Sequence, residues 1–177
     1  MRFDFSNQRV LITGGTSGIG LAIAQAFADA GANVLATGLT EAESGEAASR
    51  DSRIQFRPLD VRASSAVSEL AREFDSLNVL VNCAGMLQRG GAEFVEDNFL
   101  EVLDTNLSGT MRLCLACRPL LAKTRGCVVN TASMLSFFGS GFVPAYSASK
   151  GGVAQLTKSL AIAWAAEGIR VNAVAPG

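Results

Sequence analysis

Short runs of β-branched and aliphatic residues alternate along this chain with alanine- and leucine-rich segments of helical length, and this alternation constrains the fold most. The predicted strands cover residues 10–13, 33–37, 54–57, 79–82, 127–131 and 170–175, and the predicted helices cover 19–30, 41–49, 64–74, 97–121 and 145–167. Strands that are separated by crossovers of this length form right-handed βαβ units, and such units build a parallel sheet with helices on both faces.

The predicted fold class is therefore α/β: a Rossmann-type doubly wound parallel sheet, arranged as three αβα layers with six strands in this chain. In the strand order 3-2-1-4-5-6 the third strand lies at an edge. Residues 54–57, "IQFR", alternate apolar and polar as an edge strand should, whereas the other strands, such as "VLI" and "VLV", are predicted to be buried on both faces. Without a linker or internal repeat, residues 1–177 are predicted to form one domain.

Composition and charge exclude several kinds of partner. The net charge is -1 and the basic residues are dispersed, so no basic stripe is available to neutralise the phosphates of a nucleic acid. No apolar stretch approaches the roughly 18 residues of a membrane span, and the N-terminal residues lack the apolar run of a signal peptide. We therefore expect no nucleic acid or membrane partner and a cytoplasmic location, in which the four cysteines stay reduced.

The sequence contains no histidine, which removes Ser-His-Asp and Cys-His catalysis and histidine-ligated zinc. Cys114 and Cys117 form a C-x-x-C pair, which has two interpretations. It could be a redox or metal site, or both cysteines could pack on the apolar face of a helix in "MRLCLACRPLL". The second interpretation is favoured, because a metal would need further ligands at matching spacing, and no metal site is predicted. Acid–base chemistry must then use tyrosine, lysine, cysteine or a carboxylate.

A glycine-rich segment, "TGGTSGIG" at residues 13–20, stands at the first predicted turn from strand to helix. Such a turn presents backbone N–H groups and a helix N-terminus to an anion, and its glycines let a pyrophosphate approach the main chain closely. Its spacing differs from G-x-G-x-x-G, and no Gly-Lys-Ser/Thr follows as in a P-loop. The segment therefore predicts a nucleotide-binding loop of another type.

The segment matches T-G-x-x-x-G-x-G, the pattern of the classical short-chain dehydrogenases/reductases, and the chain resembles this family nearly end to end. Further matches are "LDV" at 59–61, "NCAG" at 82–85 with Cys83 replacing an asparagine, "TNLSG" around Asn106, and "VNAVAPG" at 171–177. Ser133 lies thirteen residues before Tyr146, and Tyr146 with Lys150 completes Y-x-x-x-K. The order and spacing of these segments make the resemblance specific.

The resemblance implies an NAD(P)-dependent oxidoreductase that interconverts a small-molecule secondary alcohol and ketone, assembled as a homotetramer or homodimer through the two longest helices. The implied catalytic residues are Asn106, Ser133, Tyr146 and Lys150. The implied cofactor-binding residues are Gly14, Thr16, Ser17, Gly18, Ile19, Gly20, Leu39, Asp60, Val61, Asn82, Ala84, Gly85, Tyr146, Lys150, Pro176 and Gly177.

Tyr146 is the only tyrosine in the chain, and on a helix it shares one face with Lys150. A nearby ammonium favours the phenolate form of a phenol, so the two side chains can act as a unit. By resemblance, Tyr146 moves the proton at the substrate oxygen and Lys150 also holds the nicotinamide ribose. Ser133 would bond the substrate oxygen, and Asn106 would hold a water that links Lys150 to solvent.

Two other functions stay open at this point: a non-catalytic dinucleotide-binding sensor or regulatory protein, and an isomerase or dehydratase that uses bound cofactor transiently.

The side chains between Ser133 and Tyr146 have two interpretations. They could line an apolar substrate pocket or belong to the core: Met134, Leu135, Phe137, Phe138 and Phe142. Family members continue beyond the Pro-Gly that ends the sixth strand, so the C-terminal substrate loop and last strand are expected to be absent from this chain.

The sequence favours NAD and leaves NADP open. The family's NAD-selecting aspartate aligns with Gly38, its NADP-selecting arginine aligns with Leu39, and Ser17 stands where many NADP-using members carry a basic residue. A 2′-phosphate without a cation would lose a charge-assisted hydrogen bond of roughly 1.5 to 3 kcal/mol. A ribose diol needs only ordinary hydrogen bonds, for example from Thr40 or Glu41, although Arg50 or Arg53 folding back toward the site would favour NADP.

Overall fold

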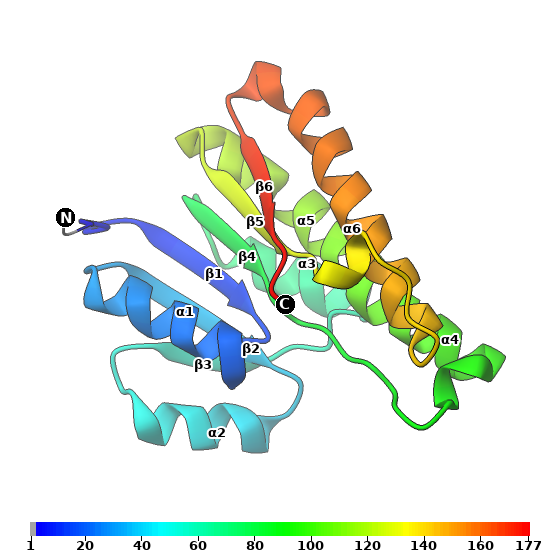
Figure 1. Cartoon of the computed structure of the whole chain (residues 1–177). Helices are drawn as coiled ribbons and strands as arrows, with labels where there is room; N and C mark the ends of the chain where they lie inside the picture. Colours follow the sequence, from blue (N-terminus) through cyan, green and yellow to red (C-terminus); the bar gives the residue numbers. More distant parts are fainter. Residues whose placement is uncertain (1–2) are drawn as a thin grey trace.

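The computed structural model describes residues 3–177, in which six strands form one parallel sheet with the order β3-β2-β1-β4-β5-β6 (Figure 1). The strands are β1 (Arg9–Thr13), β2 (Asn33–Gly38), β3 (Gln55–Pro58), β4 (Val79–Asn82), β5 (Cys127–Thr131) and β6 (Arg170–Val174). The doubly wound α/β fold and its strand order are therefore confirmed, and β3 lies at an edge as its alternating pattern predicts.

Helices cover both faces of the sheet. On one side lie α1 (Gly18–Asp29) and α2 (Glu41–Arg50), and on the other lie α3 (Ser64–Arg72), α5 (Gly109–Thr124) and α6 (Pro144–Ala163), with α4 (Glu96–Leu103) against α6 (Figure 1). Successive residues of β1 enter different cores, because side chains alternate along a strand. Val10 and Ile12 pack with Ala24 of α1, whereas Leu11 packs with Leu80 and with Leu113 of α5.

The outer part of the sheet departs from the expected burial. All four residues of β4 are buried, as predicted, but β5 alternates between buried and half-buried residues and only Val171 of β6 is buried. Within residues 3–177 Val128 and Val171 pack in the larger core. On the opposite face Cys127 and Val129 of β5 are only partly covered by the smaller core, and that face of β6 is exposed. The prediction that β5 and β6 are buried on both faces is therefore wrong.

The predicted long helix at 97–121 consists of three segments. After α4 comes a π-helical segment, η2 (Asp104–Ser108), and then α5. Within η2 the carbonyl of Asn106 accepts a hydrogen bond from the Thr110 hydroxyl at 2.8 Å. A π-turn inserts extra residues into a helix and is often found at functional sites. Three short 3-10 segments complete the fold: η1 (Ala92–Phe94), η3 (Met134–Ser136) and η4 (Ala165–Glu167).

Cys114 and Cys117 are fully buried on α5 and belong to the larger core cluster. Burial raises the pKa of each thiol to about 12, so both remain protonated at neutral pH. The packing interpretation of C-x-x-C is confirmed. In the part of the chain that the structure describes, no group of three or more metal-ligating side chains forms, and no helix is both long and apolar enough to cross a membrane.

Candidate active site

A cleft of about 700 Å³ opens where the strands β1 to β5 end, at their carboxyl ends. This is the position at which doubly wound sheets bind ligands, and the volume suits a small-molecule or cofactor site. The predicted site residues that line the cleft are Gly14, Thr16, Ser17, Gly18, Ile19, Gly20, Leu39, Asp60, Val61, Ala84, Gly85, Tyr146 and Lys150.

The glycine loop is packed so tightly that a side chain would not fit at Gly14, Gly15 or Gly20. A Cβ at Gly20 would lie 2.1 Å from the carbonyl oxygen of Gly14, and a Cβ at Gly14, where φ is +63°, would lie 2.7 Å from Ala84. Helix α1 begins at Gly18 and has neither a side-chain cap nor an acidic residue in its first turn. Its free N–H groups therefore face the cleft, where the helix dipole favours an anion such as a pyrophosphate.

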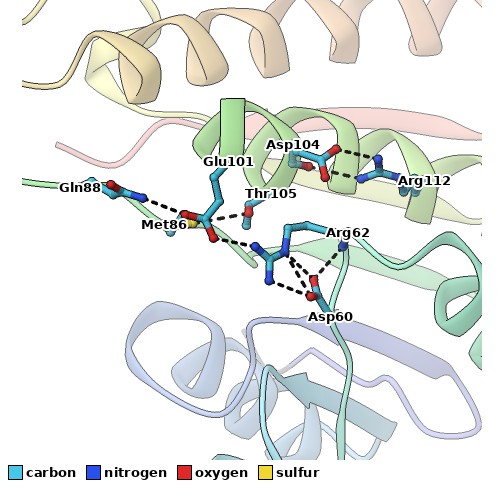
Figure 2. A network of polar contacts seen from close by, with 8 residues as sticks. All are labelled: Asp60, Arg62, Met86, Gln88, Glu101, Asp104, Thr105 and Arg112. Atoms are coloured by element: carbon cyan, nitrogen blue, oxygen red, sulfur yellow. Dashed lines mark hydrogen bonds and ion pairs between the residues drawn. The ribbon is translucent and has the colours of Figure 1, made fainter. Parts of the chain in front are cut away.

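A polar network crosses one rim of the cleft (Figure 2). The guanidinium of Arg62 donates to both carboxylate oxygens of Asp60 and also, at 2.7 Å, to Glu101 of α4, whose other oxygen accepts from Gln88 at 2.9 Å. Arg62 lowers the pKa of Asp60, so this carboxyl stays ionised. The network ties the segment after β3 to α4 and to the segment after β4, and it includes Asp60, which was predicted to bind the cofactor.

Tyr146 and Lys150 project from the start of α6 into the other end of the cleft. The ammonium of Lys150 lies 5.6 Å from the centroid of the Tyr146 ring and donates to the carbonyl oxygen of Thr131 at 2.6 Å. The phenol oxygen of Tyr146 makes no hydrogen bond within residues 3–177, so it is free to meet a substrate. The helical spacing thus places the pair as expected.

Ser133 is held beside this pair by a turn that the sequence did not reveal. Its Oγ accepts the N–H of Leu135 at 3.2 Å, which leaves the hydroxyl proton available, and its own N–H donates to Ser136 Oγ at 3.1 Å. Ser136 in turn donates to the carbonyl of Lys150 at 2.7 Å. The two serines form a capping box on η3, and Ser136 fixes Ser133 relative to α6.

Asn106 is completely buried in η2, and both polar atoms of its side chain make hydrogen bonds. The amide both accepts from and donates to the main chain of Met86, each at 2.8 Å, and donates to Ser149 of α6 at 3.0 Å. A Cβ at Gly85 would lie 3.2 Å from its Oδ1 and 3.6 Å from the Lys150 ammonium, so both groups flank the same glycine. Asn106 therefore joins η2, the segment after β4 and α6. Its water-holding role remains a prediction.

Glu93 is a further buried group at the site, and no sequence pattern indicated its role. Its side chain is 1% exposed, and its two oxygens accept the N–H of Tyr146 at 2.9 Å and the N–H of Gln88 at 3.0 Å. A carboxylate is stabilised at the N-terminus of a helix, here that of α6, by free N–H groups and the helix dipole. Glu93 thus holds the turn that carries Tyr146 against η1.

Burial has a measurable consequence at Lys150, which is 4% exposed. It lowers the pKa of this ammonium from 10.5 to about 8. Below pH 8 the lysine is charged in both states, and the fold bears the full cost of burying the charge. Between pH 8 and 10.5 only the unfolded chain keeps the proton, so the free energy of unfolding rises with pH, in total on the order of 3 kcal/mol.

We therefore expect Lys150→Met to be more stable than the wild type near pH 7, with an advantage that shrinks between pH 8 and 10.5. Urea unfolding at pH 7, 9 and 10.5 measures this difference directly. Lys158→Met, at an exposed position on the same helix, is the matched control and should show no such trend. A pH-independent difference for Lys150→Met would refute the buried-charge explanation.

Three predicted cofactor contacts do not line the cleft. Asn82 is buried between the strands and donates to Asn130 at 2.9 Å, while the Pro176 carbonyl accepts the N–H of Met134 at 3.1 Å, with Gly177 beyond it. The alternative that Arg50 or Arg53 folds back to the cleft is also wrong. Arg50 pairs with Glu46, and Arg53 pairs with Asp51 and Asp29.

The side chains between Ser133 and Tyr146 are not ordinary core. Met134, Phe137, Phe138 and Phe142 are all exposed and do not line the cleft, and Leu135 is half-buried. Other residues line the cleft without having been predicted: Gly38, Glu43, Leu59, Arg62, Cys83, Met86, Leu87, Glu101, Thr105 and Thr131. Their position in the chain could have predicted them, because most of them directly follow the end of a strand or begin the next helix, where doubly wound sheets bind ligands.

Comparison with known proteins gives consistent matches over the whole site. A family model described as "short chain dehydrogenase" matches residues 8–177. The chain is 43% identical to a 2-dehydro-3-deoxy-D-gluconate 5-dehydrogenase of Bacillus subtilis (strain 168), over 99% of this chain and 72% of that protein. It is 34% identical to the 3-oxoacyl-[acyl-carrier-protein] reductase FabG of Chlamydia muridarum, over 97% and 73%. The crystal structure of gox2181 superimposes with a TM-score of 0.92 at 33% identity, over 98% and 72%.

Proposed function

Because the chain belongs to the short chain dehydrogenase family, we propose that its cleft carries out reversible oxidation of a secondary alcohol with Tyr146 as the group that moves the proton. The chain is an oxidoreductase, and proteins of this family use NAD or NADP. The observation that carries the proposal is the buried Lys150 ammonium, 5.6 Å from the ring of the only tyrosine at the end of a glycine-lined cleft.

The residues present fit a bound dinucleotide. The glycine loop and the free N–H groups of α1 would hold the pyrophosphate, Leu39, Asp60 and Val61 would border the adenosine, and Lys150 would reach the nicotinamide ribose. A bound nicotinamide supplies the hydride acceptor or donor for the reaction.

The residues of α6 and η3 would handle the proton. In the oxidative direction the Tyr146 phenolate takes the alcohol proton, while the free hydroxyl proton of Ser133 bonds the substrate oxygen. Lys150 stabilises the phenolate electrostatically, and its lowered pKa of about 8 suits a group that exchanges protons with solvent near neutral pH. We propose that Asn106 completes this path through a water molecule.

We propose a sugar acid as the substrate class, because the Bacillus subtilis relative is named a 2-dehydro-3-deoxy-D-gluconate 5-dehydrogenase. The test incubates the purified protein with NAD or NADP and three substrate sets: keto and hydroxy sugar acids, polyols, and 3-oxoacyl thioesters. Absorbance of the reduced nicotinamide reports turnover. Fastest turnover with the sugar acids supports the proposal, and fastest turnover with the thioesters overturns the substrate class. Cofactor binding without any turnover would instead favour a non-catalytic sensor.

For the cofactor we propose NAD, because within residues 3–177 the charged groups that line the cleft do not include a free cation near the end of β2. We also propose a homo-oligomer built through the long helices, on which Leu115 of α5 and Ile162 of α6 are exposed, and light scattering tests this. Residues 1–177 are proposed to act as one dinucleotide-binding domain. Met1 and Arg2 lie outside the described residues, and the cytoplasmic location stays a prediction.

A further inference from the structure

We infer that Glu43, in the first turn of α2, takes the place of the missing strand-end carboxylate and makes the cleft select NAD over NADP. This inference rests on the proposed function, since it assumes that the cleft binds a dinucleotide. In doubly wound folds an acidic residue about 20 positions after the glycine loop accepts the hydroxyls of the adenosine ribose and repels a 2′-phosphate. Here β2 ends at Gly38, which has no side chain to do this.

The Glu43 carboxylate occupies the space that a side chain at the end of β2 would use. Its Oε2 accepts the N–H of Leu39 at 2.8 Å, directly after the strand, and a Cβ built on Gly38 would lie only 2.8 Å from that same oxygen. The same Cβ would lie 2.6 Å from Thr16 of the glycine loop. An aspartate side chain at position 38 and the Glu43 carboxylate in its observed position would therefore overlap. In this chain position 38 is glycine, and the carboxylate of Glu43 fills the space.

The local sequence explains why the side chain turns back to the strand. Thr40 caps α2 and accepts the N–H of Glu43 at 3.2 Å, so the two residues stand three apart as in a capping box. In that motif the acidic side chain reaches back to the N–H of the capping residue; here Glu43 instead accepts the N–H of Leu39, one residue before Thr40. One carboxylate oxygen is thus fixed, and the other remains free to accept a ribose hydroxyl.

Within residues 3–177 Glu43 differs from the other carboxylates that line the cleft because no arginine or lysine neutralises it. Asp60 and Glu101 also line the cleft, but both are paired with Arg62. Glu43 makes no ion pair within residues 3–177. Arg62, already shared by two carboxylates, has little capacity left to neutralise a third anion. A dianionic 2′-phosphate near the end of β2 would therefore meet an uncompensated negative charge, whereas a ribose diol would meet a hydrogen-bond acceptor.

The test measures dissociation constants of NADH and NADPH by cofactor fluorescence for the wild type and for Glu43→Gln. Removing the charge should shift the ratio of the two constants toward NADPH by at least about tenfold. The disadvantage of NADPH should shrink with added salt in the wild type and depend less on salt in the variant, because salt screens the repulsion. Glu41→Gln is the matched control, since it removes the same charge from the same helix turn but does not line the cleft.

Circular dichroism and thermal unfolding establish that both variants keep the fold. An unchanged ratio in Glu43→Gln, or an equal shift in Glu41→Gln, would overturn the inference while leaving dinucleotide binding intact. If the wild type bound neither cofactor, the proposed function would fail and the inference with it.

Discussion

Tyr146→Phe is expected to lower turnover by at least about a thousandfold while leaving NADH affinity within about threefold of the wild type. The substitution removes only the phenol oxygen, which makes no hydrogen bond within residues 3–177, and keeps the ring beside the Lys150 ammonium. No internal bond is lost, so the fold and the cofactor cleft should be preserved. Steady-state kinetics and NADH fluorescence titration measure the two quantities separately.

Two other variants show whether this effect belongs to proton transfer. Ser133→Ala should lower turnover by a smaller factor, because it removes one hydrogen bond to the substrate oxygen. Ser147→Ala removes a hydroxyl from the next residue of α6, where it bonds the carbonyl of Val143 at 2.9 Å, and should leave turnover nearly unchanged. Full activity in Tyr146→Phe would show that the proton is moved by another group.

Gly20→Ala is expected to weaken NADH binding by about a hundredfold or more, because a shift of about 1 Å in a binding loop can have an effect of that size. The added methyl would lie 2.1 Å from the carbonyl oxygen of Gly14 and 3.1 Å from Gly15. Both neighbours are backbone atoms, so the contact can be relieved only if the loop itself moves. That movement would displace the N–H groups of α1 from the position of the pyrophosphate.

Fluorescence titration of NADH measures this loss, and far-UV circular dichroism separates it from unfolding. The control is Gly45→Ala on α2, where an added Cβ has no neighbour within 4 Å and alanine is a better helix former than glycine. This control should bind NADH as the wild type does. Undiminished affinity in folded Gly20→Ala would mean that the dinucleotide does not bind at this loop.

Local patterns predicted much of the fold and of the site. Strand order and the position of β3 at an edge followed from the alternation of strands and helices. The glycine loop was found because its role depends on consecutive residues of one turn. Tyr146 and Lys150 were paired correctly because the geometry of a helix places residues four apart on one face.

Other features depended on packing between distant segments. The sequence predicted one continuous helix around Asn106, where the structure has a π-helical turn whose asparagine bonds Met86, 20 residues earlier, and Ser149, 43 residues later. Glu93 meets the N–H of Tyr146 across 53 residues. No local periodicity records such contacts, because they form only when helices and loops pack against the finished sheet.

The sequence by itself determined the α/β fold, the position of the glycine loop and the Tyr146–Lys150 pair, since each follows from the regular geometry of a strand, a turn or a helix. The tertiary structure decided how these parts are held and what surrounds them. It placed the Glu43 carboxylate against Gly38 and buried Lys150. Within the described residues it also left one face of β6 exposed and one face of β5 only partly covered. Burial and charge proximity are properties of the packed chain, and they fix the lysine's pKa and the proposed choice of cofactor.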